Sequence, residues 1–218
     1  MSLQTPKTRY PGYDVLDKRS TPSWDDITRA VIAERLAIPT QPRFLDSVQW
    51  HAMKALCGLI VAQPEDRPPV PLAAMLDALL VENSGDGYRD ARMPPLREAW
   101  RIGLAALDAE SQAQSGDLFA ELAAPAQIAL LKGMQAGELC GTSWQGMPAE
   151  LFFSERVLHD ICGAYYSHPA AWSEMGFGGP ANPRGYVRMY FDRRDPWEAV
   201  EAEPGHEEET RMENQRVR

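Results

Sequence analysis

The chain has 218 residues, 44% of them hydrophobic, which suffices for one domain with a sizeable core. Its 22 lysines and arginines are outnumbered by 31 aspartates and glutamates, giving a net charge of −9. Because an acidic chain repels phosphate backbones and no basic stripe compensates for this, we expect no binding to nucleic acid.

Neither a membrane span nor a secretory signal is visible in the sequence. No apolar run approaches about 18 residues, and no apolar stretch typical of a signal follows Arg9 or Lys18-Arg19. The three cysteines, an odd number, argue against a disulfide framework. These features predict a cytoplasmic protein that does not insert into a membrane.

The first elements are an arm and a helix. Residues 1–22 are predicted to form an extended arm, because Tyr-Pro-Gly-Tyr at positions 10–13 favours a turn over a helix interior. A helix is predicted to begin at Ser23, a favourable N-cap, and to run to about Leu36. Pro39, shortly afterwards, ends it.

Five further helices follow, each bounded by proline or glycine and carrying apolar residues at helical spacing. One of them, for example, follows Pro94-Pro95, places Trp100 and Leu104 on one face and ends before Gly116. These helices are predicted at residues 46–61, 71–82, 96–115, 125–137 and 148–167. The sequence therefore predicts an all-α fold, a compact bundle of about six helices.

The chain changes character after Pro169, where we expect a long loop. Residues 165–197 contain 8 of the 19 aromatic residues, interleaved with glycine and proline. Tyrosine, tryptophan, methionine and arginine in such a segment are typical of interface cores, so a partner-binding surface is the favoured interpretation and internal packing the alternative. With the arm, the predicted interface residues are Tyr10, Tyr13, Tyr165, Tyr166, Trp172, Phe177, Tyr186, Tyr190 and Trp197.

The end of the chain is polar and rich in glutamate, including the run at 207–209. Such a composition buries too little apolar surface to fold, so residues 198–218 are predicted to be an acidic disordered tail. The predicted organisation is an arm at 1–22, one helical domain at 23–197 and this tail.

His159 and Cys162 are the best candidates for chemistry, because three residues apart on a helix they face the same side. Cys57, Cys140 or His51 are possible further metal ligands, but no second paired motif accompanies them. A structural cysteine and a surface histidine are the simpler interpretation. A stand-alone helical metal-binding protein or enzyme that uses His159 and Cys162 remains the alternative function.

Other motifs do not assemble into an active site. Glu155 and His159 are four residues apart, whereas di-iron bundles use a spacing of three, twice over. The glycine-rich segment 176–179 lacks the preceding strand and following helix of a dinucleotide fingerprint. We therefore predict no catalytic, cofactor-binding or metal-binding residues in this chain.

Several short segments, in this order and spacing, resemble the gluconate 2-dehydrogenase subunit 3 family over roughly residues 44–197. None is a catalytic motif, so the resemblance depends on their succession along the chain. The segments are Phe44 before the helix with Cys57, then Gly103-Leu104, Leu107-Asp108, Gly116, Phe119, Gln127 and Leu130-Leu131, and finally Phe152-Phe153, Gly163, Tyr165-Tyr166-Ser167-His168-Pro169 and Gly176 to Pro180.

This resemblance implies a non-catalytic small subunit of a bacterial oxidoreductase complex. In such complexes a large FAD-containing subunit of the glucose–methanol–choline type oxidises a sugar, polyol or gluconate, and a cytochrome c subunit often carries the electrons away. The small subunit binds and stabilises the large one and holds no cofactor itself. Many relatives begin with a twin-arginine signal, which is not visible here, so the resemblance leaves export to the periplasm with a partner as the alternative to the cytoplasm.

Overall fold

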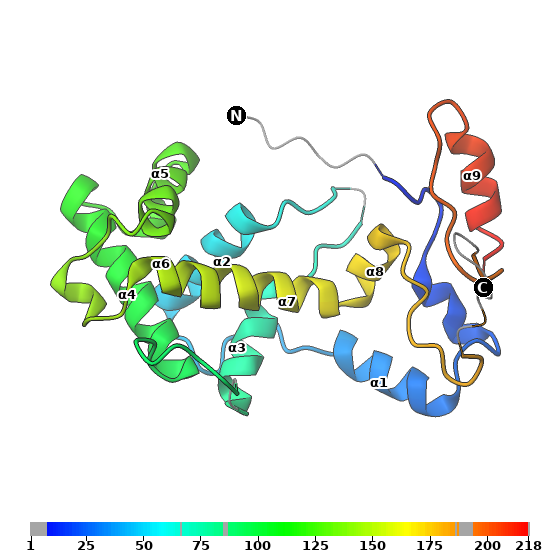
Figure 1. The fold of residues 1–218 in the computed structure, drawn as a ribbon, viewed down its shortest axis with the longest axis horizontal. Helices are drawn as coiled ribbons and strands as arrows, with labels where there is room; N and C mark the ends of the chain where they lie inside the picture. Colours follow the sequence, from blue (N-terminus) through cyan, green and yellow to red (C-terminus); the bar gives the residue numbers. More distant parts are fainter. Residues whose placement is uncertain (1–7, 66, 85–86, 186, 188–193, 218) are drawn as a thin grey trace. The chain divides into compact units, whose positions relative to one another are not determined.

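The computed structural model describes residues 8–65, 67–84, 87–185, 187 and 194–217, and all regular secondary structure in these ranges is helical (Figure 1). The all-α class predicted from the sequence is thus confirmed. The chain divides into two compact units where one helical domain was expected. Unit 1 comprises Met1–Ile38, Pro64–Val70 and Tyr165–Arg218, and unit 2 comprises Pro39–Gln63 and Pro71–Ala164.

Unit 2 contains most of the predicted helices. The helix α2 (Ser47–Ile60) begins with a capping box in which Asp46 and Gln49 satisfy each other's backbone amides. Gly116, with a φ of 86°, ends α4 in the left-handed conformation that favours glycine. The other helices are α3 (Leu72–Glu82), α4 (Leu96–Ser115), α5 (Ala124–Gln135), α6 (Ala149–Phe152) and the first part of α7 (His159–Ser167).

The core of unit 2 is organised around the ring of Phe152, which packs edge-on against Trp100 with ring centroids 5.3 Å apart and also contacts Trp144. Gly103 on α4 makes this possible, because a Cβ there would lie 2.1 Å from Cζ of Phe152. The indole nitrogen of Trp100 donates a hydrogen bond of 2.8 Å to the buried carboxylate of Asp160. The glycine and the two tryptophans therefore fix how α4 meets α6.

The helix predicted at 148–167 is present, but it contains a π-helical segment, Phe153–Leu158, between α6 and α7 (Figure 1). The sequence pattern places Leu151 and Leu158 on the buried face, whereas Val157 and Ile161 are fully buried and Leu158 is only half-buried. Phe152–Phe153, Arg156–Val157 and Asp160–Ile161 are buried at regular helical spacing through this segment. The predicted face, with Leu151 and Leu158, therefore lies beside the face that is buried.

Unit 1 contains the short 3-10 helix η1 (Val15–Ser20), α1 (Asp26–Leu36), α8 (Pro169–Met175) and α9 (Glu207–Asn214). The N-cap of α1 is Asp25, whose carboxylate accepts from the amide of Thr28, so the helix begins later than the predicted Ser23. The core of the unit is formed by Tyr13, Val15, Trp24, Ile32, Trp172, Ala199 and Val217.

The arm and the segment after Pro169, both in unit 1, differ from the sequence expectation. The predicted extended arm contains η1, and its Tyr13 and Val15 are buried in the core of the unit. The predicted loop after Pro169 begins as α8, with His168 as N-cap and Pro169 in the first turn, where a proline is tolerated. Both segments fold because they bury aromatic and apolar side chains that lie more than 100 residues apart in the chain.

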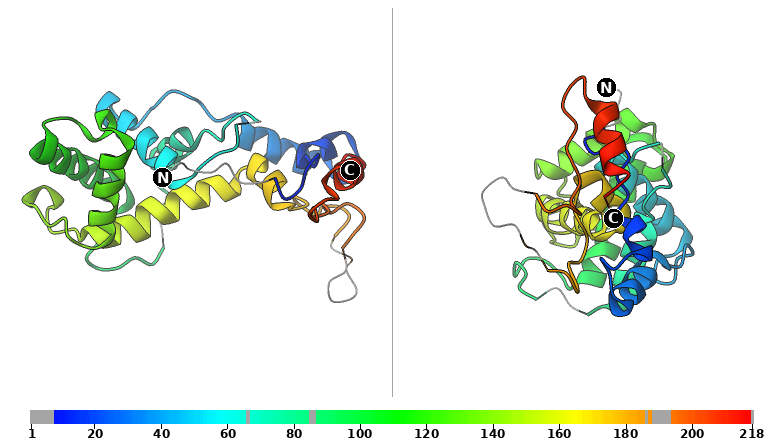
Figure 2. Two further views of the ribbon diagram at one scale, coloured as in Figure 1. Left: turned by 90° about the horizontal axis from the view of Figure 1, so that it is seen from above. Right: turned by 90° about the vertical axis from the view of Figure 1, so that its right-hand side faces the viewer.

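The predicted disordered tail instead contains α9, which Figures 1 and 2 show beside the N-terminal segment. Asn214, 1% exposed, donates to the carbonyls of Pro11 and Val200 and accepts from the Val200 amide at 2.7 Å. Thr210, Asn214 and Val217 are buried along one side of this polar segment. These three buried side chains, together with the hydrogen bonds of Asn214, thus order a sequence whose glutamates suggest disorder.

Candidate partner interface

An exposed apolar surface lies at the C-terminal end of α8 in unit 1. Met175 and Phe177 are each 40% exposed, and Gly176 between them lies against the ring of Tyr10. A Cβ on Gly176 would be 2.5 Å from Cε1 of Tyr10, and the φ of this glycine is 68°. We call the surface formed by Tyr10, Met175 and Phe177 the α8 platform.

The α8 platform rests on Trp172, which is 5% exposed. Its ring packs edge-on against Phe177 with centroids 5.6 Å apart, and its indole nitrogen donates a 2.8 Å hydrogen bond to the carbonyl of Tyr166. The guanidinium of Arg35 lies 5.8 Å from the centroid of the Trp172 ring. Because the hydrogen bond to Tyr166 and the contact with Arg35 hold the Trp172 ring in place, this ring supports Phe177 in a defined position.

The backbone of Phe177 is also tied to the core of unit 1. The Tyr13 hydroxyl donates to the carbonyl of Phe177 at 3.1 Å and accepts a 2.7 Å hydrogen bond from the ammonium group of Lys18. Lys18 is 0% exposed, and burial, aided by the nearby Arg184, lowers its pKa to about 8. Burial also raises the pKa of Tyr13, so this hydroxyl keeps its proton over the physiological range.

The structure separates the predicted interface residues into groups, which the sequence alone did not do. Tyr10 and Phe177 belong to the α8 platform, and Tyr166 is 53% exposed. Tyr13, Tyr165 and Trp172 are at most 5% exposed within unit 1, so for these three the structure favours the internal-packing alternative. Trp197 is half-buried with Arg184 4.9 Å from its ring centroid, whereas Tyr186 and Tyr190 lie outside the described residues.

Tyr165 has a local role that accounts for its burial. Its hydroxyl donates to the carboxylate of Glu174, and Arg67 lies 4.0 Å from the same carboxylate. Burial and this hydrogen bond raise the pKa of Tyr165. Met175, in contrast, is not among the interface residues predicted from the sequence. It lies between Glu174 and the glycine-rich segment, at the end of α8.

The candidate metal ligands do not come together. His159 is mostly exposed and its Nδ1 lies 3.0 Å from the carboxylate of Asp160, while Cys162 is half-buried. Cys57 is buried, which raises the pKa of its thiol to about 12, and Cys140 is exposed. In the part of the chain that the structure describes, no three histidine, cysteine, aspartate or glutamate side chains are placed to hold one metal ion.

Comparison with known proteins assigns the family. The family model for gluconate 2-dehydrogenase subunit 3 matches residues 47–179, more than half of the chain. The chain belongs to the gluconate 2-dehydrogenase subunit 3 family. No curated protein and no solved structure matches it. The resemblance noted in the sequence is therefore confirmed.

The family match of this gluconate 2-dehydrogenase subunit 3 homologue begins at the first residue of α2 and ends at Gly179. It thus includes Met175 and Phe177 of the α8 platform, whereas Tyr10 and α9 lie outside it. Within the described ranges, none of its helices is both long and apolar enough to cross a lipid bilayer. The family name denotes one subunit of a dehydrogenase complex, which gives this chain an accessory place in such a complex.

Proposed function

We propose that this chain is a non-catalytic small subunit that binds and stabilises a larger flavin-containing dehydrogenase subunit of the glucose–methanol–choline type. The complex would oxidise gluconate, another sugar or a polyol. The observation that carries this proposal is the match to the gluconate 2-dehydrogenase subunit 3 family over residues 47–179.

The α8 platform supports the proposal as a binding surface. The exposed Met175 and Phe177 and the half-buried Tyr10 are side-chain types enriched in interface cores, and Trp172 and Tyr13 hold Phe177 in position. Aromatic side chains lose little conformational entropy on binding, so pre-positioned rings are effective anchors. This surface therefore suits recognition of another protein better than it suits catalysis.

The glycine-rich segment supports the placement of FAD in the partner. Gly176 lies against Tyr10, and a Cβ on Gly179 would lie 3.0 Å from Cζ2 of Trp24 and 3.1 Å from Cγ2 of Val15. Side chains of the same unit thus fill the space beside the backbone of these two glycines. They do not form the open backbone cradle that a dinucleotide phosphate needs. We propose that the flavin, and any cytochrome c haem, are held by the other subunits.

The location of the complex forms part of the same proposal. Expressed alone, the chain would remain in the cytoplasm, and a partner with an export signal would carry it to the periplasm. Fractionation of cells that contain the chain with and without its partner distinguishes these two routes.

Affinity purification of the tagged full-length chain from its source tests the proposed function. We expect a larger polypeptide to co-purify together with a flavin spectrum and dye-linked oxidation of gluconate or another sugar. The chain produced alone in a heterologous host is the control and should lack both the spectrum and the activity. Flavin bound by the chain alone, or a stoichiometric metal ion with activity, would support the alternative of a stand-alone enzyme.

A further inference from the structure

A groove of about 360 Å³ in unit 2 combines apolar walls with acidic side chains. It lies where α2, α4 and the short 3-10 helix η2 (Phe119–Glu121) pack against one another. Val48 of α2 is 45% exposed in it, and Leu118 and Ala120 are half-buried. The other lining residues are Ser47, His51, Asp108 and Glu121.

The two carboxylates of the groove each use only one oxygen within the chain. Oδ1 of Asp108 accepts a 3.0 Å hydrogen bond from the amide of Phe119, and Oε2 of Glu121 accepts one of 3.1 Å from the amide of Leu118. Neither carboxylate makes a further hydrogen bond or an ion pair with a residue that the structure describes. Since Asp108 is only 8% exposed, a largely buried carboxylate keeps one acceptor for a ligand.

The negative charge of the groove is not balanced by its lining. Among the described residues that line it there is no lysine or arginine. Burial raises the pKa of Asp108, and the nearby carboxylates of Glu121 and Asp46 raise it further, against the lowering effect of the hydrogen bond from Phe119. His51 donates from Nδ1 to a backbone carbonyl of its own helix at 2.6 Å, which leaves Nε2 of the neutral ring as an acceptor. The groove therefore matches a cationic occupant.

The lysine and the arginines of α2 and α4 lie over aromatic rings outside the groove. The ammonium group of Lys54 is 6.0 Å from the ring centroid of Trp50. The guanidinium groups of Arg97 and Arg101 are 5.3 Å and 4.5 Å from the ring centroid of Phe44. Because neither ring lines the groove, these basic side chains do not supply the missing counter-ion.

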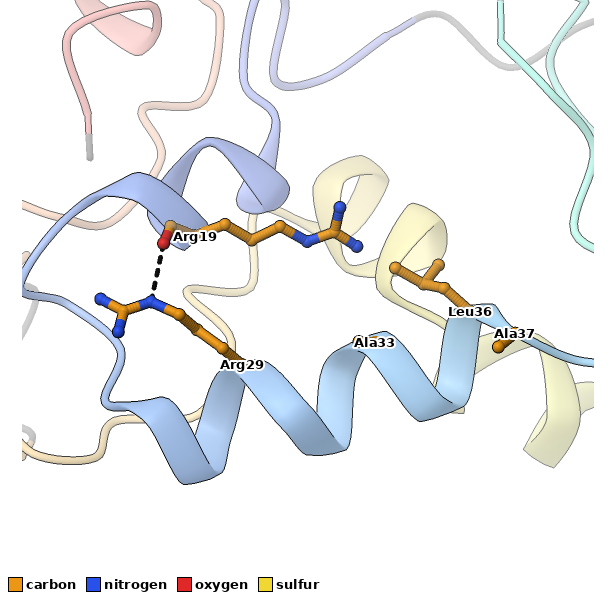
Figure 3. A pocket seen from close by; sticks show the side chains of 5 residues that line it. All are labelled: Arg19, Arg29, Ala33, Leu36 and Ala37. Atoms are coloured by element: carbon orange, nitrogen blue, oxygen red, sulfur yellow. Dashed lines mark hydrogen bonds between the residues drawn. The ribbon is translucent and has the colours of Figure 1, made fainter.

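The depression beside α1 in unit 1, drawn in Figure 3, shows the contrast. There the guanidinium of Arg29 donates to the carbonyls of Arg19 and Thr21 and pairs with Asp26 at 2.7 Å. Asp26 and Glu34, both exposed on α1, balance the charges of Arg19 and Arg29. That depression thus has no preference for a charged occupant, whereas the groove in unit 2 has one.

We infer that the groove between α2, α4 and η2 binds a lysine or arginine side chain of the dehydrogenase subunit. The inference rests on the proposed function, because it takes that subunit as the partner. The aliphatic stem of the bound side chain lies against Val48, Leu118 and Ala120, and its charged head pairs with the free oxygens of Asp108 and Glu121. Lysine and arginine suit such a groove, because their stems cover apolar surface while their heads stay with polar groups.

The position of the groove in the sequence supports this choice of partner. Its lining residues all fall within residues 47–179, the part of the chain that matches the gluconate 2-dehydrogenase subunit 3 family. The depression beside α1, in contrast, is lined by residues that precede the match. The groove therefore belongs to the region that this chain shares with other subunits of dehydrogenase complexes.

The test uses the full-length chain, purified through a tag together with the dehydrogenase subunit from its source. Asp108→Asn with Glu121→Gln removes both charges but keeps the side-chain oxygens that accept from the amides of Phe119 and Leu118. Val48→Arg places a basic side chain of this chain at the groove, where it competes with that of the partner. Glu121→Gln alone keeps the test informative if the change at the buried Asp108 disturbs folding.

Matched controls carry the same kinds of change outside the groove. They are Glu34→Gln with Glu98→Gln, at two exposed glutamates, and Val31→Arg, at a valine of α1 that is 43% exposed. Circular dichroism and a melting temperature no lower than that of the parent chain verify that each variant folds.

We expect the double variant Asp108→Asn with Glu121→Gln to weaken binding of the dehydrogenase subunit at least about 30-fold, and Val48→Arg at least about 10-fold. Glu121→Gln alone should weaken it about fivefold, and the controls should bind within about twofold of the parent chain. Raising the salt concentration should weaken the parent complex more than the complex of the double variant.

Four outcomes overturn the inference. If the groove variants hold the dehydrogenase subunit as tightly as the parent chain, the groove is not a docking site, while the proposed function stands. If the parent chain recovers no dehydrogenase, the proposed function and the inference fail together. If native mass spectrometry of the isolated chain shows a bound polyamine that the double variant lacks, the occupant is a small cation. If light scattering shows a homo-oligomer that the double variant dissociates, the occupant is a second copy of this chain.

Discussion

Replacing the buried Lys18 by methionine should stabilise the chain at neutral pH. Lys18 is 0% exposed, and its pKa falls from 10.5 to about 8 on folding, mainly because burial penalises the charged form. This shift of roughly 2.5 units corresponds to about 3 kcal/mol of lost stability at pH 7. Methionine removes that penalty but also the hydrogen bond to the Tyr13 hydroxyl, worth about 1 kcal/mol. The expected net gain in the free energy of unfolding is about 2 kcal/mol.

The pH dependence of the free energy of unfolding tests the effect of the buried Lys18 charge more sharply. Between the folded pKa of about 8 and the unfolded pKa of 10.5, the unfolded chain binds more protons at Lys18 than the folded chain, so stability rises with pH. From pH 7.5 to 9.5 the parent chain should gain about 2 kcal/mol relative to Lys18→Met. The advantage of the variant should therefore nearly vanish at the upper pH. This range stays below the usual pKa of tyrosine, about 10, so Tyr13 contributes little.

Denaturant unfolding at several pH values measures both effects. Lys132→Met, at an exposed lysine of α5, is the matched control and should change the unfolding free energy by less than about 0.5 kcal/mol at every pH. A Lys18→Met chain that is less stable than the parent at pH 7.5 would show that the buried charge of Lys18 does not destabilise the fold. A difference in unfolding free energy between the two chains that stays constant from pH 7.5 to 9.5 would show the same.

Further substitutions test the packing of each unit, the first two by the free energy of unfolding and the last by proteolysis. Gly103→Ala should cost about 3 kcal/mol, because its Cβ would overlap the ring of Phe152, whereas Gly58→Ala, with no atom within 4 Å, should be neutral or stabilising. Asp77→Ala should lower the free energy of unfolding by about 3 kcal/mol, because this buried carboxylate accepts three backbone amide hydrogen bonds from the turn before α2. A much smaller loss would show that Asp77 does not hold this turn. Asn214→Ala should release α9, seen as rapid proteolysis of the C-terminal tail, and a tail that resists protease would show that other contacts hold it.

The six helices could be predicted because their ends are encoded locally. Asp46 caps α2 and Gly116 ends α4, and both act within a few residues of their own position. The face of the helix at 148–167 was predicted wrongly, because apolar residues lie on both sides of it and the fold buries Val157 and Ile161 while Leu151 and Leu158 are only half-buried. The order of the tail was also hidden, since it depends on Asn214 meeting residues about 200 positions away.

The candidate interface was predicted only in part. The density of aromatic residues at 165–197 indicated Phe177 and Trp172, and the predicted arm indicated Tyr10 and Tyr13, but the core of unit 1 buries Tyr13 and Trp172. Composition does not distinguish exposed from buried aromatic residues, because burial depends on contacts between residues far apart in the chain, such as the hydrogen bond from Tyr13 to Phe177. The exposure of Ile27 and Val31 shows the same limit, since their spacing resembles that of core residues but the fold leaves both exposed.

Separating the purified complex shows whether the chain is an accessory subunit without catalytic chemistry of its own. Mild dissociation followed by chromatography yields this chain and the dehydrogenase subunit in different fractions, each measured for flavin fluorescence and dye-linked oxidation. We predict that flavin and residual activity remain with the dehydrogenase subunit, and that adding back this chain restores its stability. Flavin or oxidising activity in the fraction that contains only this chain would show that the chain itself carries catalytic chemistry.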